Sequence, residues 1–336
     1  MNTKTIAKAV KAIVSKNSVI PACSQIQFTG NNLIATDLET WISIPYATPF
    51  KFCAEHDNII NMWETLTDGY DVTQDESSIV FQYGKAKIKM MAQEYESYPM
   101  LEEYKKDVAI VKLLDSDVKL LTTANDFIGA DELRPSFKLI CLRKGKMYAT
   151  DSHSAMFHPL ESDIQDDVFI SKKVRTLLQL WNGDWDVYAG SKYTSFTNAD
   201  GVVITTRTSD ERYPDIDNVV PKENPVELKV IVKEFTDIIK TGSKFANKNA
   251  NRVAVVCNEG KTTLSFSDEE LGQSYEAELE LQSVNDNITI GFNSRFLDRV
   301  FKHCGNKAII EMSTPNRAAV INGTFLLMPV MLTNEN

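Results

Sequence analysis

The chain has 336 residues, which is too long for one ordinary hydrophobic core and predicts two or three domains. Its 43% hydrophobic and 24% charged residues are typical of a folded soluble protein. No apolar run reaches the ~18–20 residues that a membrane span needs, and the first residues lack the features of a signal peptide. The five cysteines are scattered and form no CxxC pair. We therefore expect a cytoplasmic protein without disulfides, metal, cofactor or membrane contact.

An internal repeat spans about a third of the chain. Residues 31–39 (NNLIATDLE) resemble residues 145–153 (GKMYATDSH) and, more weakly, residues 260–268 (GKTTLSFSD), at spacings of 114 and 117 residues. A second pair of markers, ESYP at 96–99 and ERYP at 211–214, is 115 residues apart. A period this long indicates whole duplicated domains. The predicted domains are 1–103, 104–222 and 223–336, with seams in the polar stretches near 102–106 and 221–225.

Each third combines helical and strand-like periodicity. Apolar residues at helical spacing predict helices over 3–16, 57–68, 114–128, 171–182, 231–245 and 294–304, with Ser171 and Ser294 as N-caps. Runs of β-branched and aromatic residues lie between these helices, and Asp200-Gly201 divides one run as a hairpin turn does. The fold class is therefore α+β, with three repeated domains that each pack two helices on antiparallel sheets.

Charge is distributed unevenly between helices and strands. The net charge is -10, yet the helical segments 3–16, 57–68, 114–126, 171–182, 233–252 and 294–307 hold 17 basic and 9 acidic residues. The rest of the chain holds 19 basic and 37 acidic residues. Four helices carry a basic stripe opposite an apolar one, whereas 57–68 and 114–126 are acidic. The stripes contain Lys4, Lys8 and Lys11; Lys172 and Arg175; Lys233, Lys240 and Lys244; and Arg295, Arg299 and Lys302.

A basic stripe on one helix is usually only its solvated face, but four such helices favour one shared basic surface. Neither a stacking platform of aromatic residues nor a base-reading motif accompanies them, so we expect phosphate contact without sequence readout. The chain lacks nucleotide-binding, hydrolase and zinc-protease motifs, and the aspartates after the Ala-Thr pairs are expected to cap turns. We therefore expect a non-enzymatic protein. Two alternatives remain open: a duplicated α+β enzyme acting on a phosphorylated or polyanionic substrate, and a β-rich scaffold protein with no DNA role.

Several segments together resemble the bacterial sliding clamp, the beta subunit of DNA polymerase III. They are the Ala-Thr-Asp strand ends, Arg212–Asp215, Ile290–Asn293 and the closing stretch Thr324–Leu332. The resemblance spans essentially the whole chain and is weaker in the first domain. It implies a head-to-tail homodimer that forms a ring around duplex DNA, with helices lining the hole and sheets outside. It also implies a processivity factor for replication, whose partners are DNA polymerase, the clamp loader and other proteins with a clamp-binding linear motif. Three visible repeats disfavour the eukaryotic type of clamp, which has two domains per subunit.

The resemblance also implies particular binding residues. Relatives usually have basic residues where this chain has Ser154 and Asn218, so the rim of the pocket for partner peptides is expected to be less basic. DNA-contacting loops match Lys16, Arg134 and Arg252, and the seam between subunits should join a strand near 78–91 to domain three at Phe245 and Ala246. The pocket, between domains two and three, would use Phe137, Thr150, His153, Ala155, Pro214, Val219, Leu326, Leu327, Met328, Pro329 and Leu332.

Overall fold

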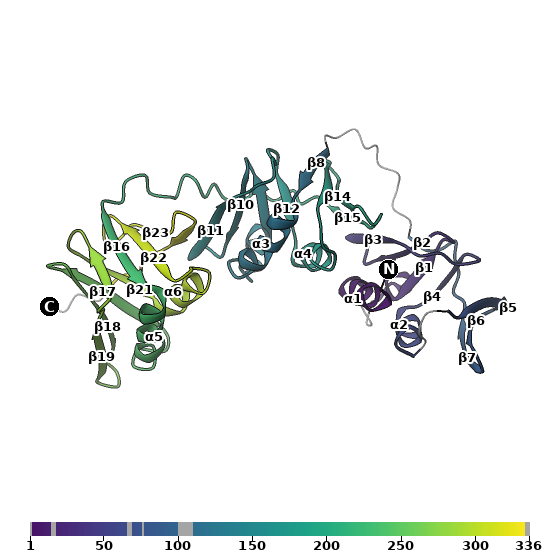
Figure 1. Ribbon diagram of the computed structural model, residues 1–336, viewed down its shortest axis with the longest axis horizontal. Helices are drawn as coiled ribbons and strands as arrows, with labels where there is room; N and C mark the ends of the chain where they lie inside the picture. Colours follow the sequence, from purple (N-terminus) through teal and green to yellow (C-terminus); the bar gives the residue numbers. More distant parts are fainter. Residues whose placement is uncertain (1, 15–17, 66–68, 76, 100–109, 333–336) are drawn as a thin grey trace. The chain divides into compact units, whose positions relative to one another are not determined.

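The structure is a computed structural model that describes residues 2–14, 18–65, 69–75, 77–99 and 110–332 (Figure 1). The chain forms two compact units. Unit 1 comprises Met1–Leu121, Leu142–Gly145 and Leu160–Asp210, and unit 2 comprises Thr122–Cys141, Lys146–Pro159 and Glu211–Asn336. The middle third of the chain therefore contributes to both units.

The order of elements repeats along the chain, and the six helices expected from the sequence are present with shorter ends. The first third contains α1 (Thr3–Ile13), η1 (Pro21–Ser24), β1 (Gln25–Phe28), β2 (Asn32–Thr36), β3 (Thr40–Pro45), β4 (Phe52–Glu55), α2 (His56–Thr65), β5 (Asp71–Asp75), β6 (Ser78–Tyr83) and β7 (Ala86–Met91). The second third contains β8 (Ile110–Leu113), α3 (Asp115–Asn125), η2 (Pro135–Lys138), β9 (Ile140–Arg143), β10 (Lys146–Thr150), β11 (Ser154–Pro159), β12 (Val168–Ile170), α4 (Lys172–Leu178), β13 (Trp185–Ala189), β14 (Tyr193–Asn198) and β15 (Val203–Arg207). The last third contains β16 (Val226–Ile231), α5 (Val232–Gly242), β17 (Arg252–Asn258), β18 (Lys261–Asp268), β19 (Gln273–Glu278), β20 (Gln282–Val284), β21 (Ile288–Asn293), α6 (Ser294–Phe301), β22 (Lys307–Met312), β23 (Ala319–Ile321) and β24 (Phe325–Leu327).

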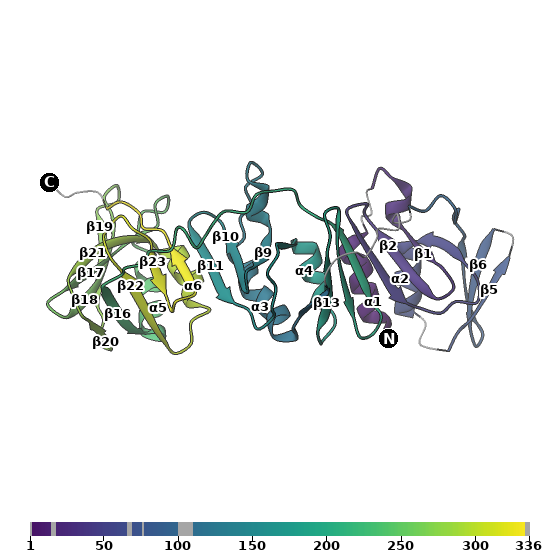
Figure 2. The same ribbon diagram turned by 90° about the horizontal axis from the view of Figure 1, so that it is seen from above.

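Unit 1 is built on an eight-stranded sheet in the order β4-β1-β2-β3-β15-β14-β13-β8. The pairing of β3 with β15, from Thr40↔Thr206 to Ser43↔Val203, joins strands of the first and second thirds. Helix α1 packs on β2 and β3, α2 on β4 and α4 on β15, and α1 touches both other helices, so the three lie on one face of this sheet. A separate three-stranded sheet, β5-β6-β7, lies at one end of the unit (Figure 2).

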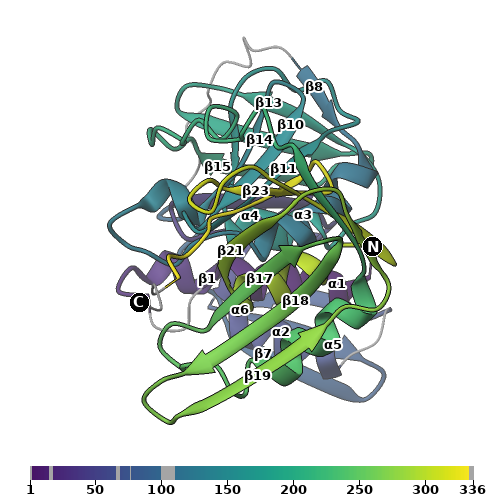
Figure 3. The ribbon, with the colours of Figure 1, turned by 90° about the vertical axis from the view of Figure 1, so that its left-hand side faces the viewer.

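In unit 2 a pair of strands likewise joins two thirds of the chain into one sheet. One of its sheets runs β10-β11-β24-β23-β22-β16-β20, and β11 pairs with β24 from Ser154↔Leu327 to Met156↔Phe325. A four-stranded sheet runs β19-β18-β17-β21, with β19 at its free edge (Figure 3). Helices α5 and α6 pack on each other, and the rings of Phe235 and Phe301 stack between them at 4.4 Å.

The duplication extends to single hydrogen bonds. The Tyr98 hydroxyl donates to the carbonyls of Gln25 and Ile34, at 3.3 and 3.2 Å. The Tyr213 hydroxyl donates to those of Leu139 and Tyr148, at 3.4 and 3.2 Å, the matching positions one repeat later. Each tyrosine thereby fastens the end of its repeat to that repeat's own strands, which explains the two Tyr-Pro markers in the sequence.

Two local predictions are confirmed and one is wrong. Ser171 caps α4, because its Oγ accepts the N–H of Val174 at 3.2 Å, and Gly201 has the positive φ of +78° that the β14–β15 hairpin requires. Ser294 is not the cap of α6. Asn293 is, since its Oδ1 accepts the N–H of Arg295 at 3.0 Å. The first predicted domain boundary, 103/104, lies outside the described residues.

Candidate functional site

The Ala-Thr-Asp motifs build two nearly identical turns. In the second, Asp151 Oδ1 accepts the N–H groups of His153 and Ser154 at 3.0 and 2.8 Å, and Thr150 Oγ1 donates to the Ser154 carbonyl at 2.9 Å. Residue Ser152 between them has a φ of +75°. Asp37 closes the matching turn of the first third in the same way, which confirms that these aspartates cap backbone groups.

The second carboxylate oxygen of each aspartate is also engaged. Lys173, on α4, binds Asp37 within unit 1, and Arg299, on α6, binds Asp151 within unit 2. Burial lowers the pKa of Lys173. Each strand-ending turn is thus tied to a helix of the following third of the chain by a charge-assisted contact.

The residues predicted to bind partner peptides all lie in unit 2, around the pairing of β11 with β24. The Met328 N–H donates to the His153 carbonyl at 2.9 Å, which holds the segment after β24 against the Asp151 turn. Thr150, Ala155, Leu326 and Leu327 are buried and form the floor under this surface. His153 and Val219 are exposed, and five more are half-buried: Phe137, Pro214, Met328, Pro329 and Leu332.

Arg299 and Phe296 complete this surface and were not predicted as part of it. The Arg299 guanidinium binds Asp151, donates to Ser154 Oγ at 3.0 Å and lies 4.9 Å from the centre of the Phe296 ring. The His153 ring stacks on the same Phe296 ring, with 5.2 Å between the ring centres. Ser154 is small and buried, and the Arg299 guanidinium from α6 supplies the positive charge beside it. Periodicity placed Arg299 on the basic stripe of α6, and no local signal marks its turn toward Asp151.

Two glycines let neighbouring segments approach this surface closely. A Cβ on Gly129 would lie 3.2 Å from the Cβ of Phe137, whose ring is also covered by Arg134, with 5.5 Å between the guanidinium and the ring centre. A Cβ on Gly291 would lie 2.5 Å from the Val330 carbonyl oxygen. The loop and the closing segment that carry the half-buried residues are therefore held at backbone contact distance.

The basic residues predicted to contact DNA divide into free-standing and engaged ones. Lys16 lies outside the described residues. Arg175 donates to Gln179 at 3.0 Å, and Arg252 is half-buried. Lys11 pairs with Glu64 at 3.1 Å and Lys302 with Asp298 at 3.2 Å. The side chains that stand exposed on their helices, opposite the buried apolar stripe, include Lys4, Lys8, Lys172, Lys240 and Arg295. Lys244 is also exposed, but it lies in the turn after α5, which ends at Gly242. Arg134 is exposed on the loop before η2.

The residues expected at the seam between subunits differ in how exposed they are. The predicted strand at 78–91 is in fact the β6–β7 hairpin, with β7 at the edge of its sheet. Phe245 is half-buried and stacks on Tyr275 of the edge strand β19 at 5.6 Å. Ala246 is only 2% exposed because it packs inside unit 2, so its own side chain is a poor candidate for contact with a second copy.

Among the described residues, His, Cys, Asp and Glu side chains do not form a group of three that could hold a metal ion. No described helix is long and apolar enough to cross a membrane. Burial raises the pKa of the Cys53 thiol to about 12 and that of Cys304 to about 11.

The arrangement of sheets and helices is that of ring-forming DNA clamps. A sliding clamp from Pseudomonas aeruginosa superposes with a TM-score of 0.85 over 99% of both chains, at 16% identity. The DNA polymerase III beta chain of Streptococcus pneumoniae does so with a TM-score of 0.84 over 98% of both, at 20% identity. Among curated proteins, the beta sliding clamp of Staphylococcus epidermidis is 22% identical over 88% of this chain and 86% of its own length. That of Bacillus subtilis is 22% identical over 67% of this chain, but the match covers only 63% of the relative, less than two thirds.

The last third of the chain also matches a family model. Residues 217–325 match the family model described as the C-terminal domain of the DNA polymerase III beta subunit. The resemblance to the bacterial beta sliding clamp family is thereby confirmed, and the fold confirms the α+β architecture expected from the sequence.

Proposed function

We propose that this chain is a DNA sliding clamp, a non-catalytic processivity factor that encircles duplex DNA in the cytoplasm and tethers replication proteins to it. The observation that carries this proposal is the match in fold over 99% of the chain to solved clamps, together with the family model over residues 217–325. The exposed lysines and arginines on α1, α4, α5 and α6 support it, because they neutralise phosphates without reading bases.

Retention on DNA of different topology tests this proposal. A ring loaded on closed circular DNA should stay bound and should run off when the circle is cut, whereas a conventional DNA-binding protein dissociates from both forms alike. Equal retention on circular and linear DNA would contradict the proposal. A variant in which four exposed basic residues of the helices are replaced by Glu should load poorly while keeping its fold. The four residues are Lys8, Lys172, Lys240 and Arg295. The matched control reverses four exposed lysines that lie on loops and turns, away from the helices: Lys51, Lys144, Lys192 and Lys222 to Glu.

The proposed ring is a head-to-tail homodimer in which β7 of one copy pairs with β19 of the other. The repeats support this pairing, because β3 and β11, which match β19, already pair with β15 and β24, which match β7. Both edges are free among the described strands, and an uncovered edge is a liability in solution. Their exposed charges are opposite: Lys85, Lys87 and Lys89 at β7, and Glu276 and Glu278 on β19.

A charge swap tests the seam. Lys87→Glu should shift the protein from twice 37.8 kDa toward the monomer mass in light scattering. Adding Glu276→Lys should restore the dimer, because the pair of opposite charges is re-formed with the signs exchanged. If neither Lys87→Glu alone nor Glu276→Lys alone weakened the dimer, the proposed seam would be contradicted.

The surface around the β11–β24 pairing is the proposed docking site for polymerase, clamp loader and other proteins with a clamp-binding motif. Its half-buried Met328 can repack around different partners, as methionine does at adaptable sites. Met328→Ala should weaken a polymerase-tail peptide by about tenfold or more, as expected for an anchor residue. Met331→Ala is the matched control, since Met331 is 77% exposed. Griselimycin, which is bound to solved clamps from P. aeruginosa and Bartonella birtlesii, serves as a competitor probe.

A further inference from the structure

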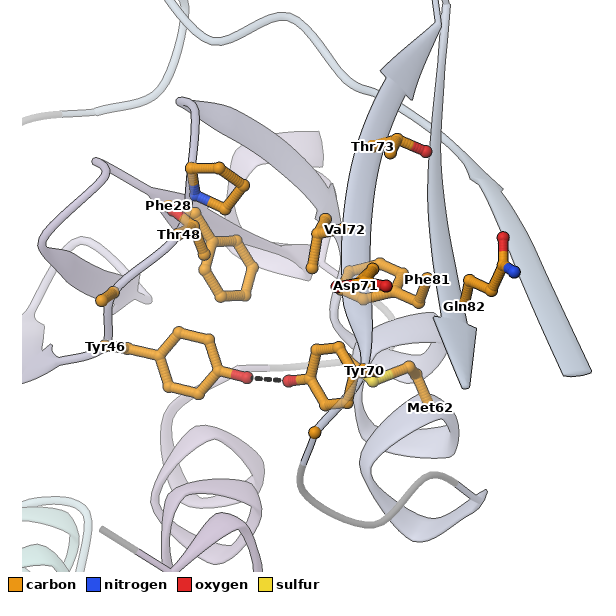
Figure 4. Close-up of a pocket in the computed structure, with 13 residues that line it drawn as sticks. Phe28, Tyr46, Thr48, Met62, Tyr70, Asp71, Val72, Thr73, Phe81 and Gln82 are labelled. Carbon is orange, nitrogen blue, oxygen red and sulfur yellow. Dashed lines mark hydrogen bonds between the residues drawn. The ribbon is translucent and has the colours of Figure 1, made fainter. Parts of the chain in front are cut away.

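A groove in unit 1 separates the edge strand β5 from the loop that follows β3 (Figure 4). Its volume is about 720 Å³. The strand side is formed by Asp71–Thr73 and the loop side by Tyr46–Pro49, while Phe28 and Phe81 line the space between them. At one end, the hydroxyls of Tyr46 and Tyr70 are hydrogen-bonded to each other across the groove.

In the second third of the chain, a strand fills the matching place. Strand β8 pairs antiparallel with β13, with Val111 opposite Val187 and Lys112 opposite Asp186. Just beyond β8, the Leu114 N–H donates to Oγ of Ser162, in the loop after β11, at 2.9 Å. One extended segment therefore connects a strand on one side with a loop on the other.

The last third repeats this arrangement. Strand β16 pairs with β22 on one side and with β20, which follows β19, on the other. Leu228 of β16, for example, lies opposite Ile310 of β22 and opposite Val284 of β20. In both thirds the inserted strand precedes the first helix of the repeat.

The groove in the first third presents both halves of this site. Val72 lies opposite Phe81 in the β5–β6 pair, just as Val187 lies opposite Phe196 in the β13–β14 pair. Thr48 precedes Ser162 by 114 residues, the spacing of the two Ala-Thr-Asp motifs. Among the described residues, no strand of the first third takes the place of β8 or β16, and β5 pairs only with β6.

We propose that this groove is an acceptor site for an extended polypeptide strand of a separate protein, which binds antiparallel to β5 by β-augmentation. The strands that occupy the sister sites define the ligand's chemistry. Opposite Val72 it should carry an apolar side chain, as Val111 does opposite Val187. The next residue should be Lys or Arg, because Asp71 matches Asp186, which pairs with Lys112 at 3.4 Å.

This site is independent of the DNA-encircling function and lies in unit 1, whereas the proposed peptide surface lies in unit 2. The exposed acidic residues at the two ends of β5, Asp71 and Asp75, favour a basic strand over an acidic one. The edge N–H and C=O groups of β5 supply main-chain binding, and the aromatic rings supply the apolar contact.

The test uses a fluorescent peptide with the sequence of residues 110–114, IVKLL, flanked by Gly and Ser. The intact protein should bind it saturably in fluorescence anisotropy, and Asp71→Lys should weaken binding by about fivefold. Replacing the peptide's Lys by Glu should restore binding to that variant. Asp200→Lys, an equal charge change in the exposed β14–β15 turn, should leave binding unchanged.

Hydrogen exchange locates the bound peptide. Amides of β5 should become protected on binding, and Val72→Asp should abolish both protection and binding. Protection at β13 in place of β5, or binding that survives both Asp71→Lys and Val72→Asp, would overturn the proposal. Concentration-dependent protection of β5 without peptide would assign the groove to a second copy of the chain and would equally overturn it.

Discussion

Gly291 offers a sharp test of how the closing segment is held. It lies in β21, its carbonyl accepts the Val330 N–H at 2.8 Å, and its backbone has no positive φ that would by itself penalise alanine. A Cβ at this position would come within 2.5 Å of the Val330 carbonyl oxygen and 2.7 Å of Leu332 Cδ2. Gly291→Ala therefore forces the segment that contains Met328–Leu332 away from β21.

The free-energy cost of Gly291→Ala depends on how far the closing segment has to move. Overpacking in a well-packed core costs about 1–3 kcal/mol, and loss of the Val330 hydrogen bond adds about 1 kcal/mol. Because the segment follows the last strand, it can shift without disturbing the sheet, so the cost to folding should fall near the lower end of this sum, about 2 kcal/mol. The thermal midpoint should drop by about 2–4 °C, while polymerase-tail peptide affinity should fall by about tenfold or more.

The assay compares peptide affinity and thermal unfolding for Gly291→Ala and for Gly305→Ala. Gly305 is the matched control, since a Cβ there would meet nothing within 4 Å and its φ is not positive. If the two variants bound peptide equally well, the closing segment would not be held by its contact with β21, and its part in the docking surface would have to be abandoned.

Three other side-chain positions are packed tightly enough for a change there to be measurable. Gly242→Ala should destabilise unit 2 by about 3 kcal/mol in urea unfolding, because its Cβ would lie 2.3 Å from the Phe266 ring inside the core; a change no larger than that of Gly305→Ala would contradict this packing. Arg299→Ala should lower stability by about 1 kcal/mol, a figure discounted for the side chain's 26% exposure, and Arg299→Lys should recover only part of it, as thermal melts can show. Cys304, whose pKa burial raises to about 11, should react slowly with iodoacetamide at pH 8 and faster as the pH rises toward that value, because only the thiolate reacts; complete labelling within minutes at pH 8 would be inconsistent with its burial.

Local patterns in the sequence predicted much of the fold. Apolar periodicity located the six helices to within a few residues, and the Asp200-Gly201 turn and the two Tyr-Pro markers correspond to real features. These succeed because each depends on neighbours in the sequence. The cap of α6 was misplaced by one residue because Asn293 and Ser294 are both good caps and only the backbone geometry distinguishes them.

Local sequence patterns do not predict which strands pair when they are far apart in the chain. Nothing in residues 40–45 indicates that β3 pairs with β15 more than 150 residues later, and the compact units follow that pairing instead of the repeats. The same holds for Arg299, which lies on the basic stripe of α6 by periodicity yet turns to Asp151 and Ser154. The groove beside β5 likewise depends on which strands of the three thirds correspond, and no single segment of the sequence encodes that correspondence.

The continuous sheets at the two joints have a consequence for how the protein can be divided. Strand β3 pairs with β15, and β11 pairs with β24. Cutting the chain between repeats would therefore leave two strand edges of the middle repeat unpaired, and one strand edge of each neighbouring repeat. Fragments made at the repeat boundaries would then expose long runs of unpaired backbone and tend to aggregate. The repeats are units of ancestry, whereas the sheets that cross from one repeat to the next are the units of cooperative folding.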